Sequence, residues 1–424
     1  MKVAKRYDVE MNNKCLTDKK ISFWLFMYIA ILYAVVYMTK NCFSAAMADI
    51  VAEGVMTKTQ TGLITAMFYI AYAPLQVMGG RLADKWKPDK LILIGLIGGI
   101  ISNLIIYFNQ NYILMLVVWT LNACSQAALW PAMFKIISSE LAREHRVRAV
   151  YYMSFIATFG LCFSFIVAAF VKRWQDNFLF SSLLLLVFTV GFVIFYPYAE
   201  KKMVPDADVE INTPSGTVKE GFDSRTMFKK CGLYVLFVVL IIRGLVELGI
   251  KNIAPTLLME SYDSVTASVG NLLNIIIILS GLIGMVAARI IFAKYVRDVM
   301  KGMLLFMSVL IPTIGVTCLV GKIDIMFIIA SLSLSIIMAS GAGIFSSYYS
   351  MSFSKYGKNG EVAGIVNSAS AVGIVIQSYG VTLVADIFGW TAVYILLTVL
   401  CAISVALLCI IYPKWKSFVR EYNM

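Results

Sequence analysis

The chain has 424 residues, of which 60% are hydrophobic and 14% are charged. A soluble domain carries about 25% charged residues, so this composition excludes a water-soluble globular protein. At about 20 apolar residues per membrane crossing, the hydrophobic content is enough for about twelve spans and leaves little chain for another domain. The formal net charge of +12 indicates basic cytoplasmic loops before it indicates nucleic acid.

Apolar runs separated by polar breaks predict twelve transmembrane helices. The first run begins after residue 21 and is too long for a signal-peptide core, so it is expected to be the first span. The runs lack the alternation of barrel strands, which predicts an all-α integral membrane fold. In chain order the predicted spans are 22–50, 59–82, 89–108, 111–138, 147–171, 177–198, 231–259, 266–293, 302–320, 323–351, 360–385 and 390–412.

The distribution of Lys and Arg predicts the orientation. With the N-terminus inside, 27 of the 36 basic residues fall in cytoplasmic segments and 4 in the opposite loops. Because cytoplasmic loops are enriched in Lys and Arg, both termini are expected in the cytoplasm, and the protein is expected in the cytoplasmic membrane.

One long polar stretch, residues 199–230, follows the sixth span and contains Pro205 and Pro214. It predicts two pseudo-symmetric six-helix halves, 1–198 and 231–424, joined by a cytoplasmic linker. This layout is typical of transporters, which bind their solute between the halves near the bilayer midplane.

The segment GGRLADKWKPDK, between the second and third spans, has a glycine followed four residues later by aspartate and then by basic residues. It resembles the signature loop of the major facilitator superfamily. The resemblance implies that fold and a gating or structural role for four residues: Gly80, Arg81, Asp84 and Lys85. The alternative is that the loop serves only as a topological anchor.

The first span contains the segment YMTKNCFSAAM, residues 37–47. It resembles the organophosphate:phosphate antiporter family, the glycerol-3-phosphate and hexose-phosphate transporters. Further likeness lies in Ile-Ala-Tyr at 70–72, Trp-Pro at 130–131, Ala-Pro-Thr at 254–256 and Asp-Ile-Phe-Gly-Trp at 386–390. In that family a substrate-binding arginine stands where this chain has Lys40.

Other family positions differ here. The position of the second binding arginine holds Glu247, with Arg243 one helical turn away, and a family lysine after Tyr72 is replaced by Gln76. The family's histidine in the fifth span has no counterpart, since the only histidine is His145 in a loop. The phosphate-binding set is therefore incomplete, and a phosphate ester cannot simply be transferred as the substrate.

Charged residues inside spans are the strongest candidates for binding, because hydrocarbon penalises unpaired charge. Arg243, Glu247 and Lys251 follow one another at i, i+4 and i+8, so they share one helix face. They form either a ladder that neutralises itself or a site where, with Lys40, three cations face one carboxylate. Lys40 itself is either a cavity residue or a snorkelling lysine. Tyr37, Tyr72 and Gln76 complete the predicted substrate-binding set.

The resulting prediction is a secondary active transporter of a small anionic organic solute, working by alternating access. The coupling partner is inorganic phosphate, implied by the resemblance, or a proton, for which Glu247 is the first candidate. Alternatives are a proton-coupled symporter of a zwitterionic or neutral solute and a transporter-like solute receptor. An enzyme is not expected, since the chain has no catalytic triad or metal-ligand cluster and its 8 cysteines are dispersed. We expect no cofactor, no metal and no nucleic-acid partner, and a monomer in the lipid bilayer.

Overall fold

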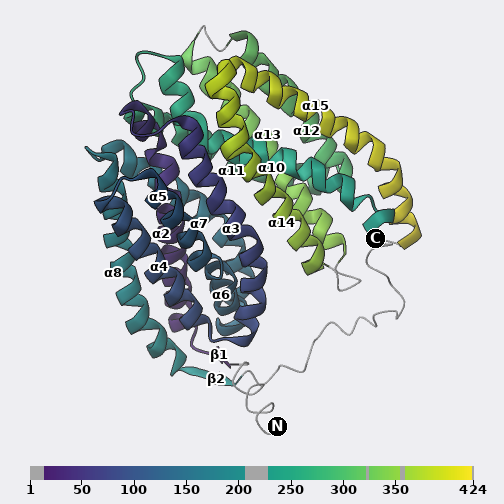
Figure 1. Ribbon diagram of the computed structural model, residues 1–424. Helices are drawn as coiled ribbons and strands as arrows, with labels where there is room; N and C mark the ends of the chain where they lie inside the picture. The colour runs from purple at the N-terminus through teal and green to yellow at the C-terminus, as the bar shows by residue number, and fades with distance from the viewer. Residues whose placement is uncertain (1–13, 206–227, 321–323, 354–358, 423–424) are drawn as a thin grey trace. The chain divides into compact units, whose positions relative to one another are not determined.

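The computed structural model describes residues 14–205, 228–320, 324–353 and 359–422. The chain forms two compact units (Figure 1), which are described separately. The first unit comprises Met1–Ala46 and Ala71–Thr213, and the second comprises Met47–Ile70 and Pro214–Met424. Most of the predicted linker, from residue 206 to 227, lies outside the described residues.

The elements of the chain are almost all helices. Those up to residue 205 are β1 (Lys14–Leu16), α2 (Lys19–Ala52), α3 (Lys58–Lys85), α4 (Pro88–Phe108), α5 (Tyr112–Gln126), α6 (Leu129–Lys135), the π-helical turn η1 (Ile136–Glu140), α7 (Arg143–Phe170), α8 (Trp174–Glu200) and β2 (Met203–Pro205). The end of α2 and the start of α3 belong to the second unit.

The remaining elements all belong to the second unit. They are α10 (Leu233–Ser261), α11 (Ala267–Lys294), α12 (Val299–Val320), α13 (Ile325–Ser352), α14 (Asn359–Ile376), the π-helical turn η3 (Gln377–Val381) and α15 (Thr382–Tyr422). Within α15 the backbone of Gly389 has φ 76°, a left-handed conformation that glycine adopts readily. This kink separates the last predicted span from the preceding one.

Each of the twelve predicted spans coincides with helical structure, which confirms the all-α membrane fold. Nine helices of the described residues are long and apolar enough to cross a membrane, and Gly364–Glu421, counted as one of them, holds most of the last two predicted spans. The sequence did not predict the strands: Lys14 pairs with Pro205, Cys15 with Val204 and Leu16 with Met203 in an antiparallel ladder. The pair ties the start of the predicted linker to the segment before α2.

Glycines let helices of the first unit approach closely. A Cβ on Gly95 of α4 would overlap the side chain of Leu129, and one on Gly98 would overlap Ser125. Small residues favour such contacts in membranes, where packing stabilises helix pairs in place of the hydrophobic effect. The six-residue run GLIGGI at 95–100 therefore seats α4 against α5 and α6.

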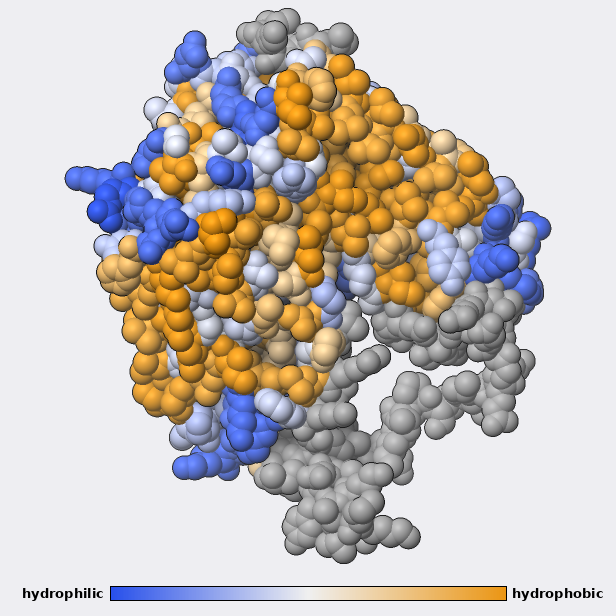
Figure 2. All heavy atoms as spheres, viewed as in Figure 1, coloured by the Kyte–Doolittle hydropathy of each residue, from blue (hydrophilic) through white to orange (hydrophobic). Residues whose placement is uncertain are grey.

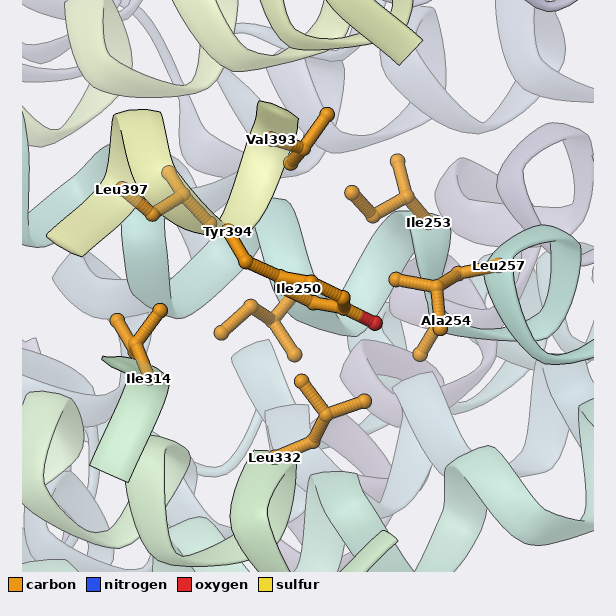
Figure 3. A pocket seen from close by; sticks show the side chains of 9 residues that line it. All are labelled: Ile250, Ile253, Ala254, Leu257, Ile314, Leu332, Val393, Tyr394 and Leu397. Carbon is orange, nitrogen blue, oxygen red and sulfur yellow. The ribbon is translucent and has the colours of Figure 1, made fainter. Parts of the chain in front are cut away.

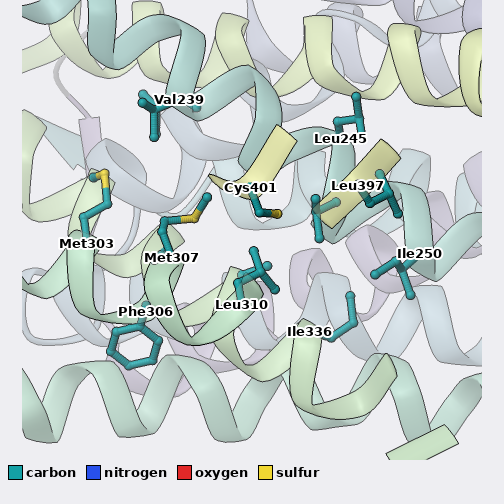
Figure 4. Packing of buried hydrophobic residues seen from close by; sticks show 14 of the residues in the cluster. Val239, Leu245, Ile250, Met303, Phe306, Met307, Leu310, Ile336, Leu397 and Cys401 are labelled. Atoms are coloured by element: carbon teal, nitrogen blue, oxygen red, sulfur yellow. The ribbon is translucent and has the colours of Figure 1, made fainter. Parts of the chain in front are cut away.

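The second unit has an extensive apolar core (Figure 4), in which Met303, Met307 and Leu310 of α12 pack near Val239 of α10 and Cys401 of α15. All five side chains are fully buried. The flexible thioethers of methionine fill irregular space between such helices.

Large apolar side chains also cover much of the outer surface visible in Figure 2. Phe108, Phe170, Ile194 and Ile410 are each more than 60% exposed. In water such surfaces would cause aggregation, whereas lipid tails solvate them. The surface agrees with a multi-pass membrane protein.

Candidate functional site

Three charged side chains of α10 form one ion-pair ladder. Glu247 accepts a hydrogen bond from Nη1 of Arg243, and its Oε1 lies 3.1 Å from Nζ of Lys251. Arg243 and Glu247 are each 8% exposed and Lys251 is 6% exposed. The i, i+4 spacing that the sequence predicts thus produces a real contact on both sides of the carboxylate.

Helices α13 and α14 supply polar partners to the ladder. Ser340 of α13 donates a 2.8 Å hydrogen bond to Oε1 of Glu247, and Nη2 of Arg243 donates one of 2.8 Å to Oγ of Ser370 on α14. Nη1 of Arg243 also lies 3.5 Å from the carbonyl oxygen of Ala339. A buried charge is tolerated when hydrogen bonds and a counter-charge replace water, as they do here.

Glycines on α10 and α13 make room for these side chains. A Cβ on Gly343 would lie 2.6 Å from Nη1 of Arg243, and a Cβ on Gly244 would lie 2.7 Å from the backbone of Ser370. Helix α10 therefore approaches α14 closely enough for Arg243 to reach Ser370. The small residues determine where the guanidinium is held.

One donor of the ladder is not satisfied. Nε of Arg243 is buried and has no acceptor among the described residues. Buried donors are rarely left unpaired in folded proteins, and those that are deserve a functional explanation. The guanidinium therefore keeps capacity for one further acceptor.

In the first unit, Lys40 packs on aromatic rings. Its Nζ lies 3.8 Å from the ring centroid of Tyr72 and 5.5 Å from that of Tyr37. The buried Tyr33 lies beside Tyr37, with 5.0 Å between ring centroids, and 4.9 Å from the ring of Trp130. A lysine held over tyrosine faces is stabilised by the negative face of each ring. Lys40 is half-buried.

The structure thus brings the predicted residues together in two groups. Arg243, Glu247 and Lys251 form the ladder of the second unit, and Tyr37, Lys40 and Tyr72 form the aromatic cluster of the first. Gln76, one turn beyond Tyr72 on α3, is half-buried. The four residues of the signature loop, Gly80, Arg81, Asp84 and Lys85, lie in the last turns of α3, and their side chains are outside the described part of the chain.

The sequence alone did not identify Ser340 and Ser370 as partners of the ladder. Neither stands out in a stretch rich in serine, alanine and glycine, and both contact α10 from helices 93 and 127 residues away in the chain. No local pattern marks such partners. The same holds for Asn274 of α11, whose amide nitrogen donates a 2.8 Å hydrogen bond to the carbonyl oxygen of Lys251 on α10.

A second polar cluster joins the start of α3 to the end of α10 and the first turns of α15. Nζ of Lys58 lies 2.7 Å from Glu260 and 3.2 Å from Asp386. Trp390 donates a 2.9 Å hydrogen bond to Glu260, and the backbone N–H of Thr59 donates one to Asp386 at the same distance. Burial alone would lower the pKa of Lys58, but the hydrogen bonds and charges of the two carboxylates outweigh it and raise this pKa.

The second unit also has a pocket lined by apolar side chains (Figure 3). Ile250 and Ile253 of α10, Leu332 of α13 and Tyr394 of α15 are among its walls. The Tyr394 hydroxyl points inward and has no hydrogen-bond partner among the described residues. With no charged side chain in its lining, this pocket does not suit an anion, so the ladder remains the better candidate.

Comparisons with known proteins match the chain to a protein family and to individual relatives. The family model described as Major Facilitator Superfamily matches residues 29–378. The membrane sensor protein UhpC of Escherichia coli is 29% identical over 139 residues, about 32% of each chain. A probable hexose phosphate transport protein of Chlamydia pneumoniae is 25% identical over 140 residues, 32% of this chain and 31% of that protein. The match thus spans only about a third of the length of these relatives.

A solved structure resembles the whole chain. A bacterial homologue of the human lysosomal transporter Spinster superposes with a TM-score of 0.74 over 95% of this chain and 99% of its own, at 12% sequence identity. At that identity the likeness shows the fold alone. Since the family model covers most of the chain, the protein belongs to the major facilitator superfamily, a family of transporters and not of enzymes, and within it resembles the organophosphate:phosphate antiporters.

Proposed function

We propose that the protein is a secondary active transporter that moves a small anionic organic solute, an organophosphate, sugar acid or carboxylate, across the cytoplasmic membrane by alternating access. The observation that carries the proposal is the buried ladder of α10, in which two cations share one carboxylate inside a membrane span. Charged groups in spans are rarely there for stability alone, because unpaired charge is costly in hydrocarbon. The relatives named for hexose phosphate transport support the same class of solute.

In this proposal each half of the protein contributes one binding surface. Lys40, with Tyr37, Tyr72 and Gln76, serves the half 1–198, and Arg243, Glu247 and Lys251 serve the half 231–424. The signature-loop residues Gly80 to Lys85 take part in gating. Both termini lie in the cytoplasm, as the distribution of basic residues favours, and the protein works as a monomer.

Removal of the proposed anion-binding cations tests the site. Arg243→Ala and Lys40→Ala should each reduce uptake of the transported anion by at least about 100-fold, because loss of a charge-assisted bond costs about 3 kcal/mol. Arg297→Ala is the matched control, since Arg297 is an exposed arginine outside the helices. Uptake into proteoliposomes is measured at equal protein incorporation. Normal uptake by both Arg243→Ala and Lys40→Ala would show that these residues do not form the binding site.

The coupling partner requires a separate experiment. Phosphate loaded inside proteoliposomes should drive entry of the external anion if the protein exchanges solute for phosphate. An imposed pH gradient should drive it if a proton accompanies the solute. A phosphate gradient without effect, together with a response to the pH gradient, would replace antiport by symport and make Glu247 the first residue to examine.

A second candidate function is solute sensing. The observation that favours it is the relative in Escherichia coli, which is named a membrane sensor protein. A receptor would bind the anion without moving it, whereas a transporter produces flux. Ligand-induced thermal stabilisation of the purified protein, combined with absence of counterflow in proteoliposomes, would select the sensor.

A further inference from the structure

We propose that the ladder of α10 accepts a head group with a single negative charge, and that Glu247 sets this limit. The inference rests on the proposed function, because it names the charge class of the solute bound at the same site. It follows from the net charge of the ladder, from the unpaired Nε of Arg243 and from the hydrogen bonds that hold Glu247 in place.

The net charge of the ladder is balanced by one anionic charge. Arg243 and Lys251 carry one positive charge each, and Glu247 carries one negative charge, so the buried cluster has a net charge of +1. A singly charged sulfonate, sulfate ester or carboxylate brings this cluster to neutrality. A doubly charged phosphate ester leaves an excess negative charge beside Glu247, which is unfavourable where water is scarce.

The guanidinium offers a place for that group. Nη1 of Arg243 is occupied by Glu247, whereas Nε is unpaired among the described residues and Nη2 donates only to Ser370. Nε–H and Nη2–H of an arginine point in parallel and match the two oxygens of an anionic group. The side chain of Arg243 as a whole retains 10% exposure, although Nε itself is buried, so an anion reaches Nε only when neighbouring groups move.

Glu247 is held too firmly to be simply displaced. Its Oε2 accepts from Arg243, and its Oε1 accepts from both Lys251 and Ser340. The partner of Oε2 lies on α10 and those of Oε1 lie on α10 and α13, so each oxygen is hydrogen-bonded. An incoming anion therefore binds next to the ionised carboxylate and is repelled by it, and this repulsion is stronger for two charges than for one.

Charge variants of the ladder test the proposal. The probes are glucose 6-sulfate, singly charged, and glucose 6-phosphate, doubly charged at pH 8 because the second pKa of a phosphate ester is about 6. A glycerol 3-sulfate and glycerol 3-phosphate pair checks that the result does not depend on the sugar. Apparent Kd values come from ligand-dependent thermal stabilisation of the purified full-length protein.

The wild-type protein should bind each sulfate ester more tightly than its phosphate counterpart. Glu247→Gln raises the ladder to +2 and should shift the ratio toward phosphate by about tenfold or more. The double variant E247Q/K251Q returns the ladder to +1 and should restore the wild-type preference, which also guards against a folding defect in the single variant. Lys40 is unchanged throughout, so the differences report the ladder alone.

The outcomes separate this inference from the proposed function. A wild-type preference for phosphate esters, a ratio unaffected by E247Q, or no binding of any of the four probes overturns the inference. Charge-dependent binding in the predicted order without counterflow of any probe upholds it and overturns transport. Transport of these anions with a charge-independent ratio overturns the inference and leaves the proposed function standing.

Discussion

Glu140 lies just beyond the predicted span 111–138, and its surroundings change the pKa of its carboxyl group. It ends η1 and accepts a 3.0 Å hydrogen bond from the Tyr196 hydroxyl of α8. Burial raises the pKa of Glu140 from 4.5 to about 7, although the bond from Tyr196 acts in the opposite direction. The carboxyl group therefore titrates near physiological pH.

This shift predicts a pH-dependent stability. Because the folded protein binds the proton of Glu140 more tightly than the unfolded chain does, the stabilisation is complete below about pH 4.5 and is lost as the pH rises through about 7. Glu140→Gln keeps a neutral side chain at every pH and should remove this part of the dependence. Melting temperatures between pH 5 and 8 are the measurement. Parallel curves for wild type and variant would contradict the prediction.

At the scale of helices, the proline of α10 is compensated by a neighbouring helix. Pro255 lacks the N–H that would bond to the carbonyl of Lys251 four residues earlier. Nδ2 of Asn274 on α11 donates a 2.8 Å hydrogen bond to that carbonyl instead. The bond joins α11 to α10 beside the charge ladder, and it explains why a polar residue is fully buried at position 274.

A double-mutant cycle tests this compensation. Asn274→Ala should destabilise the protein by about 1 kcal/mol, because it leaves a buried carbonyl without a donor. Pro255→Ala restores the backbone N–H, so Asn274→Ala should cost clearly less in that background. Unfolding in a denaturing-detergent titration gives the four stabilities. Equal costs in both backgrounds would show that the two residues act independently.

At the scale of the whole chain, the Lys58 cluster connects segments that are far apart in sequence. Lys58 contacts Glu260, 202 residues away, and Thr59 contacts Asp386, 327 residues away. The side chain of Lys58 is 15% exposed and those of the two carboxylates are 25% exposed. Charge networks of this partial burial contribute more than isolated surface pairs.

Loss of the central cation should therefore weaken the fold. Lys58→Ala leaves Glu260 and Asp386 facing each other without a counter-charge and should cost about 2 kcal/mol. Lys172→Ala removes an exposed lysine of the same charge and serves as the control. The melting temperature should fall for the first variant only. Equal shifts for the two lysines would mean that the cluster adds no stability.

Much of the site could be anticipated from local spacing. The i, i+4, i+8 positions of Arg243, Glu247 and Lys251 determine one helix face whatever surrounds the helix, so the ladder was predictable. Lys40 was a candidate because charge is rare in apolar runs. The position of Lys40 over the ring of Tyr72 could not be predicted from the sequence, because it depends on how α2 packs against α3.

The sequence by itself determined the membrane fold, the helix positions and the residues that carry buried charge, since hydrophobic run length and helical periodicity are local properties of the chain. Only the tertiary structure decided which groups surround them: Ser340 and Ser370 beside the ladder, Asn274 at the Lys251 carbonyl that Pro255 leaves without a donor, and Glu260 and Asp386 around Lys58. All of these contacts except that of Asn274 join residues more than 90 positions apart in the chain. These contacts depend on how the helices pack against one another, and no local sequence pattern predicts that packing.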